Sequence, residues 1–221
     1  MRAAVISVGD ELLAGETVNT NASWLCSRLA ENGVGVERVV VSPDDTEAVS
    51  EEVRRLADRH DAVVVTGGLG PTPDDVTAEG IARAFGKGVE VTKGAHEAAT
   101  GYSGDVSDDV AAVPEGACPV PNPEGVAPGF ALENVFALPG VPSEMKAVFG
   151  EIEGEFEGEA VSVAHVHTDE PESELLSRLE EARDSFGVEV RSYPDEDGVR
   201  LKITGEEDAV VEAREWLAER V

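Results

Sequence analysis

The sequence predicts an α/β protein: a three-layer α/β/α domain with a mostly parallel sheet, followed by a small α+β domain. Short apolar, β-branched runs such as Val63–Val65 are typical of strands that are buried on both faces of a parallel sheet. Segments with the apolar spacing of helices separate these runs, which indicates repeated strand–helix units. After residue 157 the pattern changes to alternating strands and two amphipathic helices. We therefore expect one domain over residues 1–157 and a second over 158–221.

The first domain begins with three strands that are each followed by a turn and a helix; a fourth strand and helix come after residue 130. Asn19 and its neighbours offer caps for the first long helix, and Pro142 suits the first turn of the last one. Residues 87–130 are rich in Gly, Ala and Pro; they predict two short helices, near 96–102 and 108–113, and then a rigid loop lining a cleft. We expect strands at 3–8, 36–41, 61–66 and 135–138, and helices at about 20–31, after 46, 74–85 and 145–152.

The second domain has the predicted order β-α-β-β-α. A strand at 160–167 precedes an amphipathic helix at 173–186, and strands 188–193 and 199–204 form a hairpin before a closing helix at 208–221. His165 and His167 share a face of the first strand, but they lack a clear third ligand, so we interpret them as surface residues rather than a metal site.

Composition limits the function classes. The chain has 221 residues, with 46 Asp+Glu against 17 Lys+Arg and a formal net charge of −29. A surface this acidic repels itself unless salt screens it, which indicates a haloarchaeal-type, salt-adapted protein. No basic face is visible, so nucleic acid is not an expected partner. With two cysteines and no membrane-length apolar run or signal peptide, the sequence predicts a cytoplasmic location and no membrane partner.

The stretch VVVTGGLGPTPDDVT, residues 63–77, combines a buried strand with a Gly-rich loop and an acidic helix start. Glycines allow the backbone to approach a ligand closely, and a helix N-terminus attracts phosphate or carboxylate. Asp74 and Asp75 would repel a bare anion, so they fit better if a divalent cation lies between them and the phosphates. Asp75 is the preferred functional acid, although it could instead cap the helix.

Four motifs in this order, VGDELLAGETVNTN, TGGLGPTPDDVT, PNPEGVAPGF and LPGVPSE, resemble the N-terminal domain of competence/damage-inducible protein A (CinA). That domain belongs to the molybdopterin-binding superfamily of the MoaB, MogA and MoeA proteins. Residues 160–221 resemble the small KH-like domain that follows it, without a convincing G-x-x-G clamp. The sequence lacks the C-terminal domain that carries nicotinamide-nucleotide amidase activity in full-length relatives, so that activity is not expected.

The resemblance implies a phosphate pocket at the carboxyl ends of the strands. Asp75 and Asp44 fall where the superfamily places its functional acids; they are the expected catalytic residues and the expected ligands of Mg²⁺, Mn²⁺ or Co²⁺. The residues expected to bind the phosphorylated ligand are Gly67, Gly68, Gly70, Thr72, Ser143, Glu144, Gly9, Asn122 and Gly140.

The leading functional hypothesis is a divalent-metal-dependent nucleotide pyrophosphatase of the ADP-ribose or FAD type, in which bound metal activates the attacking water. Whether the protein is an enzyme stays open. One alternative is a molybdopterin-binding or molybdenum cofactor biosynthesis protein without pyrophosphatase activity. Another is a non-catalytic, oligomeric binding module. In each case the resemblance implies a nucleotide or pterin ligand and a homo-oligomer, dimer or trimer.

Overall fold

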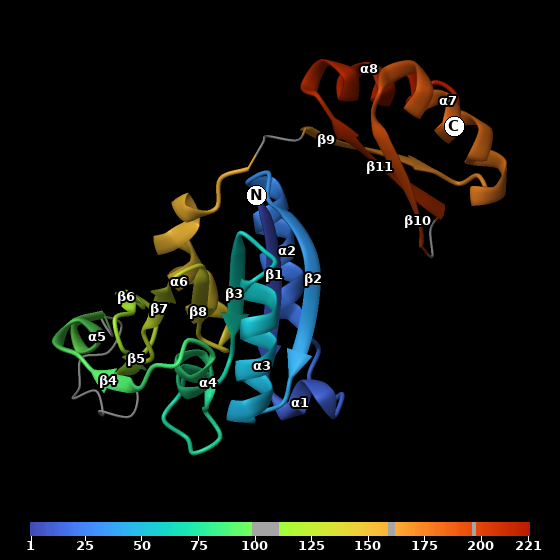
Figure 1. Cartoon of the computed structure of the whole chain (residues 1–221). Helices are drawn as coiled ribbons and strands as arrows, with labels where there is room; N and C mark the ends of the chain where they lie inside the picture. The colour runs from blue at the N-terminus through green and yellow to red at the C-terminus, as the bar shows by residue number, and fades with distance from the viewer. Residues whose placement is uncertain (99–110, 159–161, 196–197) are drawn as a thin grey trace. The chain divides into compact units, whose positions relative to one another are not determined.

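The computed structural model describes residues 1–98, 111–158, 162–195 and 198–221, and it divides into two compact units (Figure 1). Unit 1 is Met1–Glu159 and unit 2 is Ala160–Val221.

The main sheet of unit 1 has six strands in the order β2-β1-β3-β8-β7-β6. Strands β2, β1, β3 and β8 are parallel, while β7 is antiparallel to both of its neighbours. A separate antiparallel pair is formed by β4 and β5. The strands are β1 (Arg2–Val8), β2 (Gly35–Ser42), β3 (Ala62–Thr66), β4 (Val89–Val91), β5 (Ala112–Pro114), β6 (Cys118–Val120), β7 (Gly129–Leu132) and β8 (Val135–Leu138).

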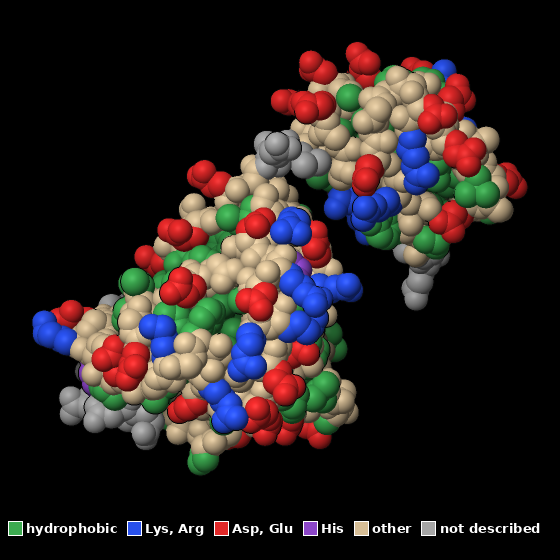
Figure 2. Space-filling view, in the orientation of Figure 1, with side chains coloured by type: hydrophobic (Ala, Val, Ile, Leu, Met, Phe, Trp, Pro, Cys, Tyr) green, Lys and Arg blue, Asp and Glu red, His purple; other side chains and the backbone are tan. Residues whose placement is uncertain are grey.

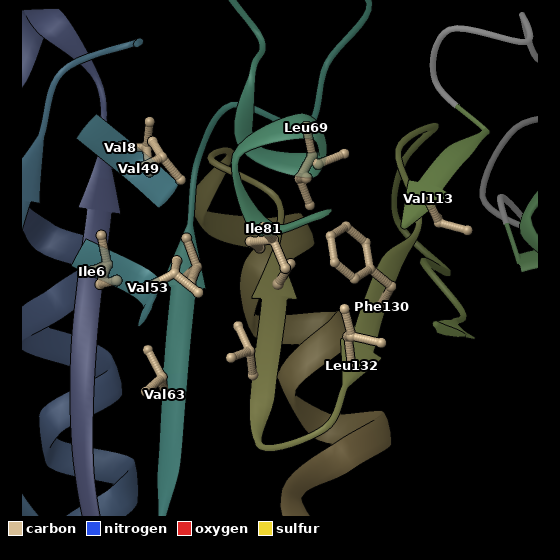
Figure 3. Close-up of a cluster of buried hydrophobic side chains, with 14 of the residues drawn as sticks. Ile6, Val8, Val49, Val53, Val63, Leu69, Ile81, Val113, Phe130 and Leu132 are labelled. Carbon is tan, nitrogen blue, oxygen red and sulfur yellow. The ribbon is translucent and has the colours of Figure 1, made fainter. Parts of the chain in front are cut away.

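Helices cover both faces of this sheet, because alternate residues of β1 and β3 supply two separate cores. Ile6 and Val65 belong to the core under α3 and α4 (Figure 3), whereas Val5 and Val64 belong to the core under α2 and α6. This explains why the interiors of the central strands, residues 3–6 and 62–65, are apolar at every position. The helices are α1 (Asp10–Leu13), α2 (Thr20–Glu31), α3 (Thr46–Ala57), α4 (Thr77–Ala84), α5 (Lys93–Ala98) and α6 (Pro142–Ile152), with a 3₁₀ turn, η1 (Glu153–Glu155).

The structure corrects the elements predicted for residues 87–130, the Pro- and Gly-rich middle of unit 1. The helix expected near 96–102 is α5, which begins at Lys93, and residues 99–110 lie outside the described part of the chain. The second expected helix, near 108–113, is wrong over its described end, because Val113 belongs to β5 and pairs with Glu90 of β4. The expected loop at 114–129 contains the short strand β6.

Unit 2 has the element order β9 (Ser162–Thr168), α7 (Glu172–Phe186), β10 (Glu189–Asp195), β11 (Gly198–Gly205) and α8 (Glu207–Ala218). This is the predicted β-α-β-β-α order, although the specific likeness to KH domains stays a prediction. The antiparallel sheet runs β10-β11-β9, and residues such as Leu175 and Leu201 form its own core. Across the described residues of both units, no helix is long and apolar enough to span a membrane.

Candidate functional site

Three loops leave the main sheet at one edge. Strand pairing places Ser7 opposite Thr66 and Thr66 opposite Leu138, so β1, β3 and β8 end side by side. The loops that follow begin at Gly9, Gly67 and Pro139. Ligands of open α/β sheets bind at this carboxyl edge, where the sequence placed the site.

The turn at Gly67 and Gly68 requires glycine at both positions. Their φ angles are 101° and 65°, and a Cβ atom on Gly67 would lie 2.3 Å from the backbone oxygen of Val8. The Thr77 hydroxyl at the start of α4 donates to the Gly67 carbonyl at 2.8 Å, which fixes the turn against the helix. The loop therefore presents main chain rather than side chains to the edge of the sheet.

The loop after β8 approaches the same turn. A Cβ atom on Gly140 would lie 3.3 Å from the Cα atom of Gly67, so the two glycine backbones are neighbours. The Thr66 hydroxyl donates to the carbonyl of Pro139 at 2.9 Å and ties β3 to this second loop.

Asn21 joins three segments of the site, although the sequence predicts only a helix-capping role for it and its neighbours. Its Nδ2 donates to the Gly140 carbonyl at 2.7 Å and to the Thr66 hydroxyl at 3.3 Å. Its Oδ1 is buried and, among the described residues, has no hydrogen-bond partner. A buried acceptor of this kind is costly unless a donor reaches it. The sequence signal that could have indicated Asn21 is the Asn-Thr-Asn run at residues 19–21. In that run Asn19 caps α2, since its side chain accepts a hydrogen bond from the Ala22 amide at 3.1 Å.

Two cavities lie on either side of these glycines and share Gly140. The larger cavity has a volume of about 410 Å³ and is mainly apolar, with Asp75 and Glu144 as its charged residues. The smaller cavity has a volume of about 120 Å³ and is lined by hydroxyl and amide groups as well as Glu11. Among the described residues, no lysine or arginine lines either cavity. The larger cavity is lined by Gly68, Leu69, Gly70, Pro71, Asp75, Val126, Ala127, Pro139, Gly140, Val141 and Glu144. The smaller is lined by Ser7, Val8, Glu11, Leu12, Thr17, Val18, Asn19, Thr20, Asn21, Thr66, Gly67, Gly140 and Pro142.

Asp75 lies in the larger cavity and closes a turn. Its Oδ2 accepts from the backbone amide of Thr72 at 2.9 Å and from the Thr72 hydroxyl at 2.5 Å. A Cβ atom on Gly70 would lie 2.6 Å from the same oxygen. The interpretation of Asp75 as a helix cap is wrong, because the residue preceding α4 is Val76 and no side chain caps that helix.

Asp44 lies elsewhere at the sheet edge. Its Oδ2 accepts from the Asp10 amide at 2.9 Å, which holds the start of α1 beside the end of β2, and it lines neither cavity. Within the described residues, no three His, Cys, Asp or Glu side chains come together in a way that could hold a metal ion. The divalent cation between Asp75 and Asp44 thus stays a prediction, and we assign no reaction step to it.

Glu144 is held at the cavity by Asn122. The Nδ2 of Asn122, which is fully buried, donates to the Glu144 carboxylate and to the Ala127 carbonyl, both at 2.7 Å. Gly125 allows this approach, because a Cβ atom there would lie 2.0 Å from the Glu144 carboxylate. Asn122 therefore supports the cavity wall without lining it, and Gly9, Thr72 and Ser143 also lie outside both linings.

Several known proteins are similar to this chain. A protein of Archaeoglobus fulgidus is 39% identical over 213 residues, covering 93% of this chain and 91% of its own length. A CinA-like protein of Citrifermentans bemidjiense is 43% identical over 173 residues; the match covers 71% of this chain but only 42% of that relative.

Solved structures are also similar. The crystal structure of CinA from Thermoplasma acidophilum, a protein described as of unknown function, is 36% identical with a TM-score of 0.66, and the match covers 71% of this chain and 99% of that one. A molybdopterin biosynthesis protein of Mycobacterium abscessus, 22% identical with a TM-score of 0.50 over 70% and 90% of the two chains, shares the fold.

The family model described as "probable molybdopterin binding domain" matches residues 4–156, a range that contains every loop of the candidate site. The chain therefore belongs to the probable molybdopterin binding domain family, and its first unit resembles CinA proteins.

Proposed function

We propose that unit 1 binds a phosphorylated pterin of the molybdopterin type and holds it without cleaving a pyrophosphate. The observation that carries this proposal is the mainly apolar cavity of about 410 Å³ that opens beside the bare backbone of Gly68, Gly70 and Gly140. A flat heterocycle fits such a lining, because small-molecule sites combine apolar walls with a few placed polar groups. Family membership supports the same ligand class.

The polar groups of the larger cavity favour a ring that donates hydrogen bonds. Asp75 and Glu144 are acceptors when ionised, and no cationic side chain among the described residues lines the cavity. A pterin carries N–H donors on its pyrimidine edge, which suits these carboxylates. Its phosphate then lies at the Gly67–Gly70 turn, and a ligand hydroxyl or amine in the smaller cavity supplies the donor that Asn21 Oδ1 lacks.

Pyrophosphate hydrolysis has less support in this geometry. Asp75 and Asp44 were expected to share a metal ion, yet Asp44 lines neither cavity and contacts the start of α1 instead. We therefore place the binding function first and treat metal-dependent hydrolysis as an outcome to be tested.

Self-association is part of the proposal. Leu13, at the end of α1, is 56% exposed, and Val18, which lines the smaller cavity, is 79% exposed. Apolar side chains this exposed favour contact with a second copy. Light scattering of the purified chain at several concentrations distinguishes a dimer or trimer from a monomer.

The binding experiment titrates the full chain with neopterin monophosphate and follows pterin fluorescence. Asp75→Asn should weaken binding about tenfold or more, because a hydrogen bond to a charged group is lost. Asp74→Asn is the matched control: it is the same change one residue away, on an exposed side chain outside both cavities. Equal effects of the two substitutions, or no binding at millimolar ligand, would overturn the proposal.

The catalytic alternative is tested in parallel with ADP-ribose and Mg²⁺, Mn²⁺ or Co²⁺. Release of AMP that disappears in Asp75→Asn but persists in Asp74→Asn would establish hydrolysis in place of simple binding. Absence of AMP with every metal, together with pterin binding, is the result that we expect.

A further inference from the structure

The three-stranded sheet of unit 2 has one face that no described element covers. Helices α7 and α8 pack on the other face, where Val190, Leu201 and Val166 are buried. Because side chains alternate along a strand, the neighbouring positions project from the open face. These positions are exposed or half-buried throughout.

Three cationic side chains, two histidines and a tyrosine occupy two adjacent cross-strand rows on this open face. In the first row Lys202 of the central strand lies opposite Arg191 on one side and His165 on the other. In the second row Arg200 lies opposite Tyr193 and His167. We call these six residues the basic face.

The basic face contrasts with the rest of a chain in which 46 acidic residues outnumber 17 basic ones. Figure 2 shows blue side chains gathered on the sheet side of this unit, with red ones over its helices. Neither row contains an acidic residue, although acidic positions flank both rows: Glu189, which pairs with Arg191 at 3.0 Å, precedes the first, and Asp195 follows the second. This local grouping of Arg191, Arg200 and Lys202 on one face of unit 2 was not anticipated from the sequence.

The charges on this face act on one another. Partial loss of solvent around the ring lowers the pKa of His165, and the neighbouring Arg200, Lys202 and His167 lower it further. Like charges held together in this way are relieved by an anion that lies across them.

We propose that the basic face binds single-stranded nucleic acid. Successive rows on one face of a strand are about 7 Å apart, twice the rise per residue, so an extended phosphate backbone can follow the two rows. The planar guanidinium groups of Arg191 and Arg200 match phosphate oxygens in a bidentate manner.

Tyr193 favours nucleic acid over an acidic protein surface as the occupant. The residue is 38% exposed, and the Arg200 guanidinium lies 5.1 Å from the centroid of its ring. An aromatic ring and a planar cation side by side form a platform on which a base of any sequence can stack. An acidic protein surface would contact the cationic side chains but would have no base to stack on this platform.

The distant acidic residues do not prevent this contact. At 0.15 M salt the Debye length is about 8 Å, so charges on the helical side of unit 2 are largely screened from a ligand on the sheet. The groups in direct contact are screened much less.

The test uses the full chain and a fluorescently labelled oligouridylate of twelve nucleotides, followed by anisotropy in 0.15 M KCl. Wild-type protein should bind, and Lys202→Glu should weaken binding at least tenfold. Arg214→Glu is the matched control, because Arg214 is exposed on α8 in the layer opposite the basic face and the charge change is the same. Circular dichroism verifies that each variant is folded.

A second variant, Tyr193→Ala, keeps every charge and should weaken oligouridylate binding several-fold without changing competition by polyglutamate. If Lys202→Glu fails to fold, Arg200→Gln takes its place in the comparison. No binding by folded wild-type protein, or equal losses in Lys202→Glu and Arg214→Glu, would overturn the proposal. The basic face would instead be assigned to an acidic protein if polyglutamate competed as well as unlabelled oligouridylate and Tyr193→Ala left oligouridylate binding unchanged.

Discussion

Asn21 connects α2, β3 and the loop before α6 through one side-chain amide. Replacing it with Ala removes the hydrogen bonds to the Gly140 carbonyl and the Thr66 hydroxyl. Lost hydrogen bonds of this kind cost about 1–2 kcal/mol in the free energy of unfolding. Urea denaturation should show this loss for Asn21→Ala, whereas Ser23→Ala, at an exposed position of the same helix, should leave the midpoint nearly unchanged.

His165 offers a prediction about pH. Its pKa is lowered by burial and by the positive charges of Arg200, Lys202 and His167, so the folded chain holds this proton less tightly than the unfolded chain does. The unfolding free energy should therefore decrease as pH falls through the ordinary histidine pKa of about 6.5 and level off below the folded value. NMR titration of the His165 ring should give a pKa below 6.5.

The variant Lys202→Glu tests the cause of that shift, because it replaces one of the three charges with an opposite one. The His165 pKa should rise in this variant. A pKa that stays unchanged would mean that the shift comes from burial alone and would weaken the electrostatic description of the basic face.

At the scale of a loop, Gly67 and Gly15 show two different reasons why a position requires glycine. Both have positive φ, 101° and 72°, but only Gly67 is crowded: a Cβ atom there would lie 2.3 Å from the Val8 oxygen, while nothing lies within 4 Å at Gly15. Gly15→Ala should cost about 1 kcal/mol for the left-handed conformation. Gly67→Ala should cost more than about 3 kcal/mol, because strain and a backbone clash add. Equal unfolding midpoints would show that the turn relaxes.

The elements that the sequence predicts well are those with one dominant local signal. The run Val63–Val65 becomes part of β3, and the predicted strand at 36–41 is the interior of β2. Helix α4 begins at residue 77 instead of 74, because Asp75 is engaged by Thr72 in a turn that competes with helix. This turn depends on a hydrogen bond between residues 72 and 75, and the spacing of apolar residues carries no information about such a bond.

The site shows the same division. The Gly-rich loop and Asp75 are visible as a motif, and the structure places them beside the larger cavity. Asn21 and Asn122 act through hydrogen bonds to residues 119 and 22 positions away, so only the folded chain reveals what they hold. Asp44 was placed by resemblance, and its contact with the Asp10 amide depends on how β1 and β2 pair.

For the whole molecule, the net charge of −29 predicts a strong dependence of stability on salt. Raising KCl from 0.1 M to 1 M shortens the Debye length from about 10 Å to about 3 Å and relieves self-repulsion. The melting temperature should rise over this range. Sorbitol at matched osmolarity is the control, and an equal rise in sorbitol would remove the electrostatic explanation.

The basic face shows why charge patterns are hard to interpret from a sequence. Its residues come from three strands between positions 165 and 202, and acidic helices occupy the sequence around them. Only antiparallel pairing brings Arg191, Lys202 and His165 into one row. Overall composition therefore underestimates local charge wherever a sheet collects alternate residues.

The glycine turns of unit 1 have a consequence for how this site can diverge. The Gly67 and Gly140 backbones are direct neighbours, so this part of the candidate site consists of groups that every amino acid possesses. A substitution at either glycine would disrupt the turn rather than adjust which ligand it binds. Selectivity must then change at the walls, at positions such as Pro71, Val126 and Val141. Proteins with this turn can thus acquire new ligands by exchanging wall residues while the turn itself stays fixed.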